Sequence, residues 1–324
     1  MKQVLVVGEG AWGTAIATLL ADNGFTVLLW CHDPQVAQTI AEKRINQRYL
    51  PGITLSETII PVTDLSVAQQ VDFIFEATPV VYVRSVLEQL KPYVTKNHTW
   101  VLLCKGIEQG YLLLPSQILD DVMGYSTKNV ILTGPSFARD LANCDTTAVV
   151  LASKDAQLAA DLQSMLANNY FKPFLSDDVI GVQAAGALKN VVTLALGMLD
   201  GAGYSDNARA FLFTQALQEI KTMITTLGGV PETTYGLAGI GDLVLTSMGN
   251  KSRNREVGHR LGAGDLLSTI LEQTGYTPEG INTVQSIHQL AAKYEITLPL
   301  CAQIYHIIFG DGKTEDIVTS LMAL

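Results

Sequence analysis

The sequence predicts an α/β protein with a doubly wound, mostly parallel sheet in its N-terminal part and an all-α C-terminal domain. Short apolar runs alternate with helical patterns up to about residue 178. Beyond that point strand signals stop and only helical patterns continue. A chain of 324 residues also suits two domains better than one. We therefore expect domains at residues 1–178 and 179–324.

Composition and charge exclude several classes of protein. Hydrophobic residues make up 48% of the chain and charged residues 16%, which predicts a large buried core and excludes a disordered chain. The net charge of −10 disfavours nucleic acid and anionic membranes as partners. The cysteines are far apart and show no metal-ligand spacing, so we expect reduced thiols, no metal site and a cytoplasmic protein. They are Cys31, Cys104, Cys144 and Cys301. The first residues run directly into a strand pattern, and we expect no signal peptide.

The first strand–turn–helix carries a dinucleotide-binding fingerprint. An apolar run at 3–7 is followed at once by Gly8, Gly10 and Gly13 in a G-x-G-x-x-G pattern, and a helical pattern covers 14–21. In this context the first glycine permits a tight turn and the second lets the backbone approach a pyrophosphate. The third lets helix and strand pack closely, and the helix N-terminus faces the phosphates. The sequence therefore predicts a Rossmann-like domain that binds a dinucleotide.

The second strand, at 26–30, ends at Cys31-His32-Asp33-Pro34. An acidic residue here binds the ribose 2′-hydroxyl of NAD, and a basic one accommodates the 2′-phosphate of NADP. His32 and Asp33 are neighbours, so the sequence leaves the choice of cofactor open. It also leaves open that both residues merely end the strand before a helix starting at Pro34.

Five more strands are expected, and polar residues follow two of them. Lys105 stands at the carboxyl end of the strand at 100–104, where open α/β sheets bind ligands, although a lysine that merely ends a strand is common. Residues 134–138, GPSFA, follow the strand at 130–133. Pro near a first turn and Ser136 as a cap predict a helix start whose N–H groups hold an oxyanion. The remaining strands are expected at 71–77, 147–152 and 171–175.

The second domain is predicted to begin with an unusual helix. Residues 181–200 are apolar almost throughout, and Lys189 is their only basic residue. Three interpretations compete: a lysine that reaches the surface from a core helix, a transmembrane span, and a desolvated lysine that exchanges protons. Lys, Asn and Gln near mid-span argue against the membrane. Burial would lower the pKa of the lysine toward the working range of a proton donor and acceptor.

Two loops in the helical half carry polar clusters. The turn at 236–242, GLAGIGD, ends in Asp242, which is either a helix cap or the carboxylate partner of a buried lysine. Residues 249–255, GNKSRNR, gather three cations, which makes them either a solvated patch or a phosphate site at a loop-to-helix junction. The helices are expected at 178–200, 206–227, 256–262, 267–273, 280–294, 299–309 and 313–322.

Taken together, these stretches resemble the bacterial-type NAD(P)-dependent glycerol-3-phosphate dehydrogenases over nearly the whole chain. The motifs that carry the resemblance are GEGAWGTA (8–15), CKGIE (104–108), GPSFARDL (134–141), GALKNVVTLALGMLDG (186–201), ARA (208–210), GLAGIGDLVLT (236–246), SRNREVG (252–258) and PEG (278–280). The resemblance implies reversible reduction of dihydroxyacetone phosphate, a small phosphorylated triose, to sn-glycerol 3-phosphate for phospholipid synthesis. It implies NAD or NADP as the cofactor. A homodimer is expected from the apolar helical domain.

The resemblance also implies the site residues. Lys189 is implied to exchange the proton at the C2 oxygen, with Lys105 and Asp242 beside it. The implied substrate contacts are Lys105, Gly134, Ser136, Lys189, Asp242, Ser252, Arg253 and Asn254. The implied cofactor contacts, beyond the three glycines of the fingerprint, are Ala11, Trp12, His32, Lys105, Ala138, Arg253 and Glu279.

Two alternative functions remain at this point. One is another reductase with a dinucleotide domain and a helical domain, such as a ketopantoate reductase or a β-hydroxyacid dehydrogenase. Those substrates are carboxylates, whereas the SRN and GPSF motifs favour a phosphate. The other alternative is a non-catalytic dinucleotide sensor. Lys189 argues against a sensor, because a buried ammonium costs free energy and a sensor has no need for such a group.

Overall fold

The computed structural model describes residues 2–249 and 252–323. The chain divides into two compact units, and each is described by itself. The first unit comprises Met1–Cys104 and Pro115–Val179. The second unit comprises Lys105–Leu114 and Ile180–Leu324.

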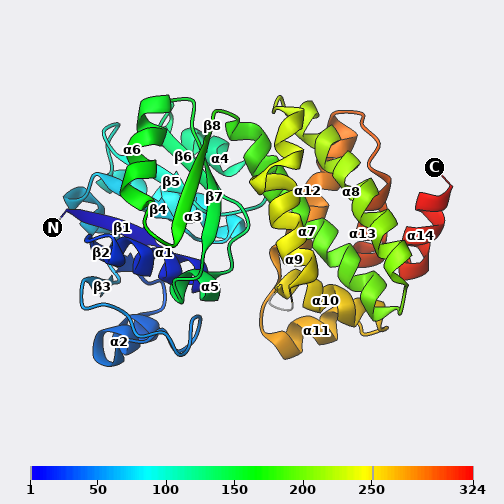
Figure 1. Cartoon of the computed structure of the whole chain (residues 1–324), viewed down its shortest axis with the longest axis horizontal. Coiled ribbons are helices and arrows are strands. Elements are labelled where there is room, and N and C mark those ends of the chain that lie inside the picture. Colours follow the sequence, from blue (N-terminus) through cyan, green and yellow to red (C-terminus); the bar gives the residue numbers. More distant parts are fainter. Residues whose placement is uncertain (1, 250–251, 324) are drawn as a thin grey trace. The chain divides into compact units, whose positions relative to one another are not determined.

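The first unit is built on one eight-stranded sheet with the strand order β3-β2-β1-β4-β5-β6-β7-β8 (Figure 1). Neighbouring strands are parallel, except that β6 and β7 run antiparallel. This confirms the predicted doubly wound, mostly parallel sheet. The strands are β1 (Gln3–Val7), β2 (Thr26–Trp30), β3 (Ile59–Val62), β4 (Phe73–Glu76), β5 (Thr99–Leu102), β6 (Lys128–Thr133), β7 (Thr147–Ala152) and β8 (Phe171–Ser176).

Helices connect these strands, and the apolar sides of several of them pack with buried strand residues into one core cluster. The central strands are buried on both faces, as helix-covered parallel strands are, which explains their unbroken apolar runs. The helices are α1 (Ala11–Asp22), α2 (Pro34–Lys43), α3 (Val80–Leu90), α4 (Pro115–Met123), α5 (Ala138–Ala142) and α6 (Ala156–Leu166). Two short 3₁₀ helices are η1 (Leu65–Gln70) and η2 (Lys91–Tyr93).

Strand β3 is missing from the sequence prediction. Its sequence, Ile-Ile-Pro-Val, contains Pro61, which cannot donate a ladder hydrogen bond and therefore argues against a strand. The sheet accommodates Pro61 because β3 is an edge strand that pairs with β2 alone. Its side facing away from β2 has no strand to which a backbone N–H must donate.

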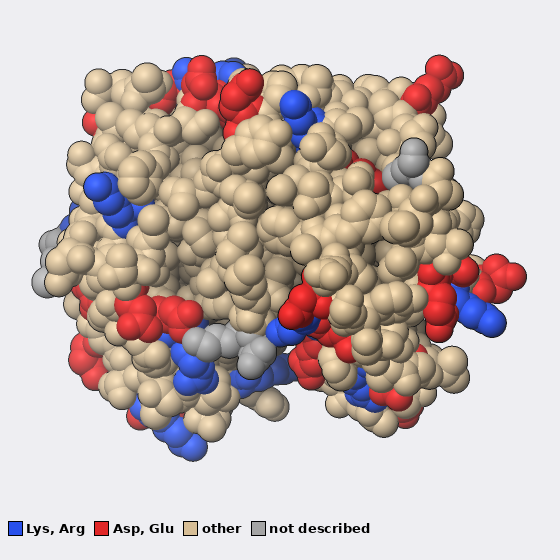
Figure 2. Space-filling model, turned by 45° about the vertical axis from the view of Figure 1, so that its right-hand side comes forward, with Lys and Arg blue, Asp and Glu red and all other residues tan. Residues whose placement is uncertain are grey.

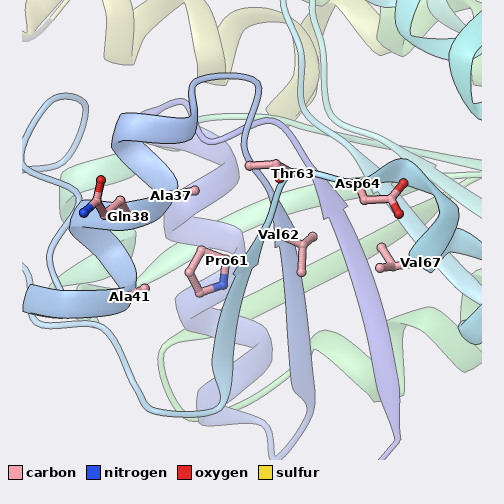
Figure 3. Close-up of a pocket in the computed structure, with 8 residues that line it drawn as sticks. All are labelled: Ala37, Gln38, Ala41, Pro61, Val62, Thr63, Asp64 and Val67. Atoms are coloured by element: carbon pink, nitrogen blue, oxygen red, sulfur yellow. The ribbon is translucent and has the colours of Figure 1, made fainter.

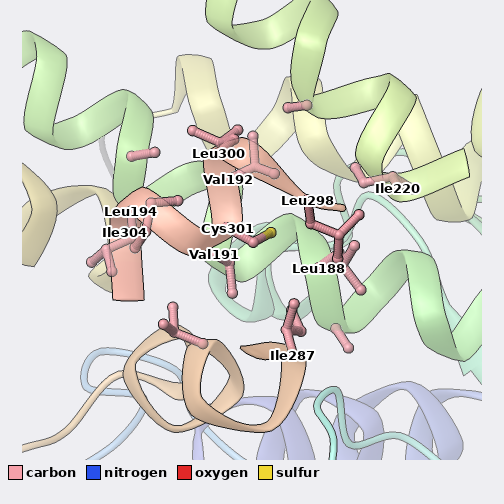
Figure 4. Packing of buried hydrophobic residues seen from close by; sticks show 14 of the residues in the cluster. Leu188, Val191, Val192, Leu194, Ile220, Ile287, Leu298, Leu300, Cys301 and Ile304 are labelled. Atoms are coloured by element: carbon pink, nitrogen blue, oxygen red, sulfur yellow. The ribbon is translucent and has the colours of Figure 1, made fainter. Parts of the chain in front are cut away.

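The second unit is helical, as predicted, and α7 (Val179–Gly201) runs through its core. Every residue from 181 to 199 is buried. The other helices are α8 (Asp206–Thr226), α9 (Asp242–Met248), α10 (Arg253–Gly262), α11 (Leu267–Thr274), α12 (Glu279–Lys293), α13 (Pro299–Phe309) and α14 (Thr314–Met322). Figure 4 shows Leu188, Val191 and Val192 of α7 among apolar side chains of neighbouring helices. The sequence prediction missed the short helix α9.

Within the described part of the chain, α7 is the one helix that is long and apolar enough to cross a membrane. Its most apolar window is 89% buried inside the protein. That burial is the pattern of a core helix, which meets protein on all sides instead of lipid.

The segment 105–114 follows β5 in the chain but belongs to the second unit. Ile107 and Leu114 are buried in the core cluster of that unit. The hydroxyl of Ser286, on α12, donates to the backbone carbonyls of Ile107 and Glu108 at 3.1 and 3.4 Å. These contacts attach the segment that begins with Lys105 to the helical unit.

Helices α7 and α10 cross with their backbones in close contact. A Cβ at Gly201 would lie 1.9 Å from the carbonyl oxygen of His259, and one at Gly258 would lie 2.1 Å from that of Leu194. Any side chain larger than hydrogen would therefore force the helices apart. Four glycines line this crossing, two from each helix: Gly197, Gly201, Gly258 and Gly262.

Candidate functional site

The second unit contains a buried cluster of two lysines and one aspartate. The carboxylate of Asp242 accepts from Lys189 Nζ through Oδ1 and from Lys105 Nζ through Oδ2, each at 2.6 Å. The side chain of Asp242 is 1% exposed, that of Lys189 7% and that of Lys105 16%. Asp242 is the first residue of α9 and follows Gly241, so its backbone position orients the carboxylate toward α7. Asp242 is thus the partner of the buried lysine.

The environment of Lys189 lowers its pKa to about 8. Burial is the main cause, because desolvation disfavours the ammonium form. The negative charge of Asp242 opposes this shift, and the positive charge of Lys105 adds to it. Lys189 can therefore both hold and release a proton near neutral pH.

A chain of hydrogen bonds links Asn190, the residue after Lys189, to Glu279 and to the start of α10. Asn190, beside the lysine on α7, donates to the carboxylate of Glu279 at 3.1 Å. Asn254 donates to the side-chain oxygen of Asn190 at 3.1 Å and accepts from the N–H of Gly280 at 2.9 Å. Sequence reasoning missed Asn190, although an amide next to the lone lysine of an apolar helix was a usable signal.

Glu279 lies among the cations of this unit. Burial raises the pKa of its carboxyl, while the charges of Arg253, Lys105 and Lys189 oppose that shift. The carboxylate therefore lies within electrostatic reach of both the lysine cluster and the start of α10. As the first residue of α12, it also interacts favourably with that helix N-terminus.

The N-terminus of α10 presents polar side chains. Ser252 caps the helix, with Oγ accepting from the N–H of Arg255 at 3.3 Å. The exposed Arg253 lies with its guanidinium 5.4 Å from the centre of the Tyr276 ring. Residues 250 and 251 of the predicted basic cluster lie outside the described residues. The helix begins at Arg253, three residues before the predicted start, because the Ser252 cap begins it.

Arg255, also in the first turn of α10, forms an ion pair with Asp200. Its guanidinium donates to Oδ2 of Asp200, at the end of α7, from Nε at 3.0 Å and from Nη2 at 2.7 Å. Arg209 of α8 donates to the other oxygen of the same carboxylate at 2.5 Å. Both arginines lower the pKa of Asp200 against the effect of burial. This ion cluster joins α7, α8 and α10 and holds the first turn of α10 in place.

In the first unit, the fingerprint glycines have the conformations that a dinucleotide site needs. Gly8 has φ +112°, a region that disfavours residues with a side chain. A Cβ at Gly13 would lie 2.0 Å from the carbonyl oxygen of Gly8, whereas one at Gly10 would meet no atom of the described residues within 4 Å. Gly10 is also the N-cap of α1, and this helix N-terminus has no side-chain capping hydrogen bond. Ala11 and Trp12 form the first turn, so the open space lies at a helix N-terminus, where anions bind favourably.

At the end of β2, Asp33 is the N-cap of α2 and accepts from the N–H of Gln35 at 2.8 Å. Its other oxygen accepts from Nη1 of Arg48 at 2.7 Å. His32 is exposed, and its ring centre lies 6.0 Å from that of Trp30. Asp33 therefore begins the helix, as one open interpretation had it, and it is also paired with a cation that the sequence did not single out.

Gly134, Ser136 and Ala138 belong to the first unit as well. Gly134 has φ +134°, and the hydroxyl of Ser136 donates to its carbonyl at 3.0 Å. The expectation that Ser136 caps the next helix is wrong. Phe137 is the N-cap of α5, without a side-chain hydrogen bond, because the Ser136 hydroxyl is directed back to the preceding turn.

A shallow hollow of about 440 Å³ lies on another part of the first unit (Figure 3). Its lining comes from α2, from the end of β3 and from η1, and Asp64 is its one ionisable residue. None of the predicted site residues lines it. The residues that line the hollow therefore include no cation for a phosphorylated ligand. The lining residues are Ala37, Gln38, Ala41, Pro61, Val62, Thr63, Asp64 and Val67.

Charge on the surface is mixed. On the face seen in Figure 2, acidic side chains lie beside basic ones within a largely uncharged surface. An anionic ligand of this acidic chain must therefore be bound by local cations.

Comparisons with known proteins match nearly the whole chain to one family. Residues 3–159 match the family model of the NAD-dependent glycerol-3-phosphate dehydrogenase N-terminus, and residues 178–319 match that of its C-terminus. The chain is 40% identical to a glycerol-3-phosphate dehydrogenase [NAD(P)+] of Bacillus velezensis, over 100% of this chain and 94% of that protein. It is 39% identical to the enzyme of the same name from Bacillus subtilis, with the same coverage.

Solved structures give the same result. A glycerol-3-phosphate dehydrogenase from Coxiella burnetii superposes with a TM-score of 0.93 at 33% identity, covering 100% of this chain and 99% of that one. A ketopantoate reductase from Ralstonia eutropha superposes with a TM-score of 0.65 at 14% identity, covering 99% of each chain. The second likeness shows a shared fold alone.

Proposed function

The chain belongs to the NAD-dependent glycerol-3-phosphate dehydrogenase family, and we propose that Lys189 is its acid–base residue. The protein is an oxidoreductase that reduces dihydroxyacetone phosphate to sn-glycerol 3-phosphate, reversibly, with NADH or NADPH. The observation that supports the role of Lys189 is its buried pairing with Asp242, beside Lys105. In this proposal the first unit binds the dinucleotide and the second supplies the groups that act on the substrate.

The chemistry requires a proton at one oxygen atom. The nicotinamide, when bound, supplies a hydride to C2 of the ketone, and the carbonyl oxygen becomes an alkoxide. Lys189 donates the proton to that oxygen and takes it back in the reverse direction. Asp242 holds the ammonium in one orientation, and Lys105 adds a second positive charge that stabilises the developing oxyanion.

The substrate phosphate is proposed to bind at the start of α10. Arg253 can donate two hydrogen bonds to a phosphate, and Ser252 and Asn254 flank it with a hydroxyl and an amide. The helix N-terminus adds backbone N–H groups. Gly134 and Ser136 are proposed to complete the substrate contacts. Phosphate binding remote from C2 orients the ketone for reaction.

The cofactor is proposed to bind along the fingerprint and the residues that follow the strands. Gly10 supports this placement, because the open space beside its Cα is where a pyrophosphate approaches the backbone most closely. The proposed contacts are Gly8, Gly10, Ala11, Trp12, Gly13, His32, Lys105, Ala138, Arg253 and Glu279.

One assay tests the proposal. Purified protein is mixed with NADH or NADPH, and cofactor oxidation is followed at equal concentrations of dihydroxyacetone phosphate, dihydroxyacetone and ketopantoate. We expect rapid turnover of dihydroxyacetone phosphate, weak turnover of the unphosphorylated ketone and none of the carboxylate. Faster oxidation with ketopantoate than with dihydroxyacetone phosphate contradicts the proposal.

We further propose that the protein is a cytoplasmic homodimer whose product supplies phospholipid synthesis. The described cysteines are free thiols, three of them buried, as suits a reducing compartment. The helical unit exposes Leu266, Phe309 and Met322, and apolar surface of this kind suits a symmetric interface. Sedimentation should give a mass near twice the 35.0 kDa of one chain, and a mass near 35.0 kDa rules out the dimer.

A further inference from the structure

Glu9 stands at the second position of the G-x-G-x-x-G fingerprint, and its carboxylate is hydrogen-bonded to the backbone at the end of β2. Its Oε2 accepts from the backbone N–H of His32 at 3.2 Å, and its Oε1 accepts from that of Asp33 at 3.1 Å. Glu9 itself is only 7% exposed. A buried carboxylate from the first loop thus bonds to the backbone just beyond β2.

Buried neighbours hold this arrangement in place. Asn46, which is fully buried, donates to the backbone carbonyl of Glu9 at 2.7 Å and to the hydroxyl of Thr14 at 2.8 Å. Thr14 donates to the same carbonyl at 3.0 Å. The backbone carbonyl of Glu9 thus accepts two hydrogen bonds, and the side chain extends from a fixed point.

The end of the second strand is where dinucleotide folds distinguish their cofactors. An acidic group there accepts a hydrogen bond from the ribose 2′-hydroxyl of NAD, whereas NADP carries a 2′-phosphate at the same position. A 2′-phosphate needs hydrogen-bond donors and positive charge around it. In this chain the carboxylate of Glu9 already accepts from the two backbone N–H groups of His32 and Asp33.

The charges around this point are unfavourable for a dianion. Arg48 is the nearby guanidinium, and it is paired with Asp33 at 2.7 Å. That pairing leaves the carboxylate of Glu9 without a cationic partner among the ion pairs of the described residues. The pKa of Cys31, at the end of β2, is raised to about 12, first by burial and then by the charges of Glu9 and Asp33. Two carboxylates, those of Glu9 and Asp33, and one guanidinium, that of Arg48, thus lie near the strand end.

We propose that Glu9 is a specificity-determining residue that makes this enzyme prefer NAD(H) to NADP(H). Each carboxylate oxygen has a second lone pair, so one of them accepts the ribose 2′-hydroxyl while both keep their backbone donors. The same negative charge repels a 2′-phosphate. The inference rests on the proposed function only for the location of the dinucleotide, and it needs no assumption about Lys189 or the substrate.

Two substitutions test the proposal. Glu9→Gln removes the charge at nearly constant shape, and Glu9→Ala releases both backbone N–H groups for a phosphate. The control is Glu42→Gln, which makes the same change on an exposed carboxylate of α2 in the same unit. A melting curve of each variant without cofactor shows whether it is folded.

The first readout is binding, without catalysis. Dissociation constants of NADH and NADPH are measured by cofactor fluorescence, and those of adenosine 5′-monophosphate and adenosine 2′,5′-bisphosphate by calorimetry. We expect the wild type to bind NADH more tightly than NADPH. Each Glu9 variant should shift that ratio toward NADPH by about tenfold, which corresponds to about 1.4 kcal/mol. The adenosine fragments should follow the same order, and the Glu42 control should match the wild type.

The second readout is kcat/KM for both cofactors with dihydroxyacetone phosphate, which should shift in the same direction. A wild type that prefers NADPH overturns the inference, and so does an unchanged cofactor ratio in both Glu9 variants. If either occurs while the wild type still reduces dihydroxyacetone phosphate, the inference fails and the proposed function stands. A wild type that binds neither dinucleotide overturns both.

Discussion

At the scale of single residues, Lys189 carries the proposed chemistry. An ammonium in an apolar helix is very costly without a partner, and the carboxylate of Asp242 supplies that partner at 2.6 Å. Because Asp242 also binds Lys105, two positive charges share one negative charge. Burial, with the charge of Lys105 added to it, lowers the pKa of Lys189 to about 8 while the group stays hydrogen-bonded.

Replacing Lys189 by Met should remove the proton donor and leave the apolar packing of α7 largely intact. We expect kcat to fall by about 10²- to 10⁴-fold, the usual contribution of a general acid–base group. NADH binding, measured by fluorescence, should stay near the wild-type value. Lys154→Met, at an exposed position, is the control and should keep full activity. A folded Lys189 variant with wild-type kcat contradicts the assignment.

The lowered pKa of Lys189 also predicts opposite pH profiles for the two directions. Reduction needs the ammonium, so its kcat/KM should be constant below about pH 8 and fall above it. Oxidation of sn-glycerol 3-phosphate needs the neutral amine, so its kcat/KM should rise with pH and level off above about pH 8. Profiles in both directions check this. If both directions respond to pH in the same way near that value, another group controls the proton.

Arg253 is expected to bind the substrate phosphate. Arg253→Ala should cost about 2–5 kcal/mol in kcat/KM for dihydroxyacetone phosphate, because it leaves a bound charge unpaired. At saturating NADH, activity on unphosphorylated dihydroxyacetone should change little, and added phosphite should activate the wild type more than the variant. Arg260→Ala, on the same helix but paired with Asp265, is the matched control. An equal loss on both substrates shows that Arg253 is not a phosphate ligand.

At the scale of elements, the crossing of α7 and α10 relates the two halves of the proposed substrate site. Helix α7 carries Lys189, and the first turn of α10 carries Arg253. The backbones touch along the four glycines of the crossing, so the distance between these helices has little freedom. The bond between Asn254 and Asn190 joins the same helices near the site.

A methyl group at this crossing should separate the helices. Gly258→Ala places a Cβ 2.1 Å from the carbonyl oxygen of Leu194, and overpacking of this kind costs about 1–3 kcal/mol. The free energy of unfolding, measured in urea, should fall by at least that amount. Gly236→Ala is the control, because its Cβ would meet only the Thr233 oxygen, at 3.6 Å. Equal stability of the two variants would show that the two helices can move apart at little energetic cost.

At the scale of the whole molecule, folding and dinucleotide binding should be coupled. A ligand at about 100 times its dissociation constant stabilises the native state by about 2.7 kcal/mol, so NADH should raise the melting temperature. Gly10→Ala should melt like the wild type without NADH, because its Cβ meets nothing within 4 Å in the described part of the chain. It should lose much of the NADH-dependent rise, because that Cβ enters the space left for the pyrophosphate.

Gly13→Ala should behave differently, since its Cβ would lie 2.0 Å from the carbonyl oxygen of Gly8. This variant should melt at a lower temperature even without NADH. Melting curves of both variants, each with and without NADH, separate a ligand space from a packing contact. Similar melting of the two variants without NADH would contradict this distinction.

Much of the architecture could be predicted from local patterns. Apolar runs bounded by turn residues located seven of the eight strands, and helical periodicity located most helices of the second unit. The strand–glycine–helix order of the fingerprint located the dinucleotide loop. The sequence by itself also singled out Lys189, because one cation in an otherwise apolar helix is visible without any structure.

Other features were decided only by tertiary structure. Strand β3 can contain Pro61 because it lies at the edge of the sheet, where the missing N–H breaks no ladder hydrogen bond. The sequence of the strand does not reveal this place in the sheet. Glu9 looks like an ordinary loop residue until the end of β2 is brought beside it. Segment 105–114 follows a strand in the chain, but its buried side chains pack with helices of the other unit.

The partners of Lys189 show why the sequence could not predict such features. Asp242 lies 53 residues away in the chain from Lys189 and 137 residues away from Lys105. Periodicity and turn chemistry describe neighbours along the chain, so the sequence by itself determined which local elements form and where a costly charge stands. Pairing over such separations depends on how the helices pack and exclude water. Tertiary structure alone therefore decided which carboxylate compensates the buried charge and how far its pKa falls.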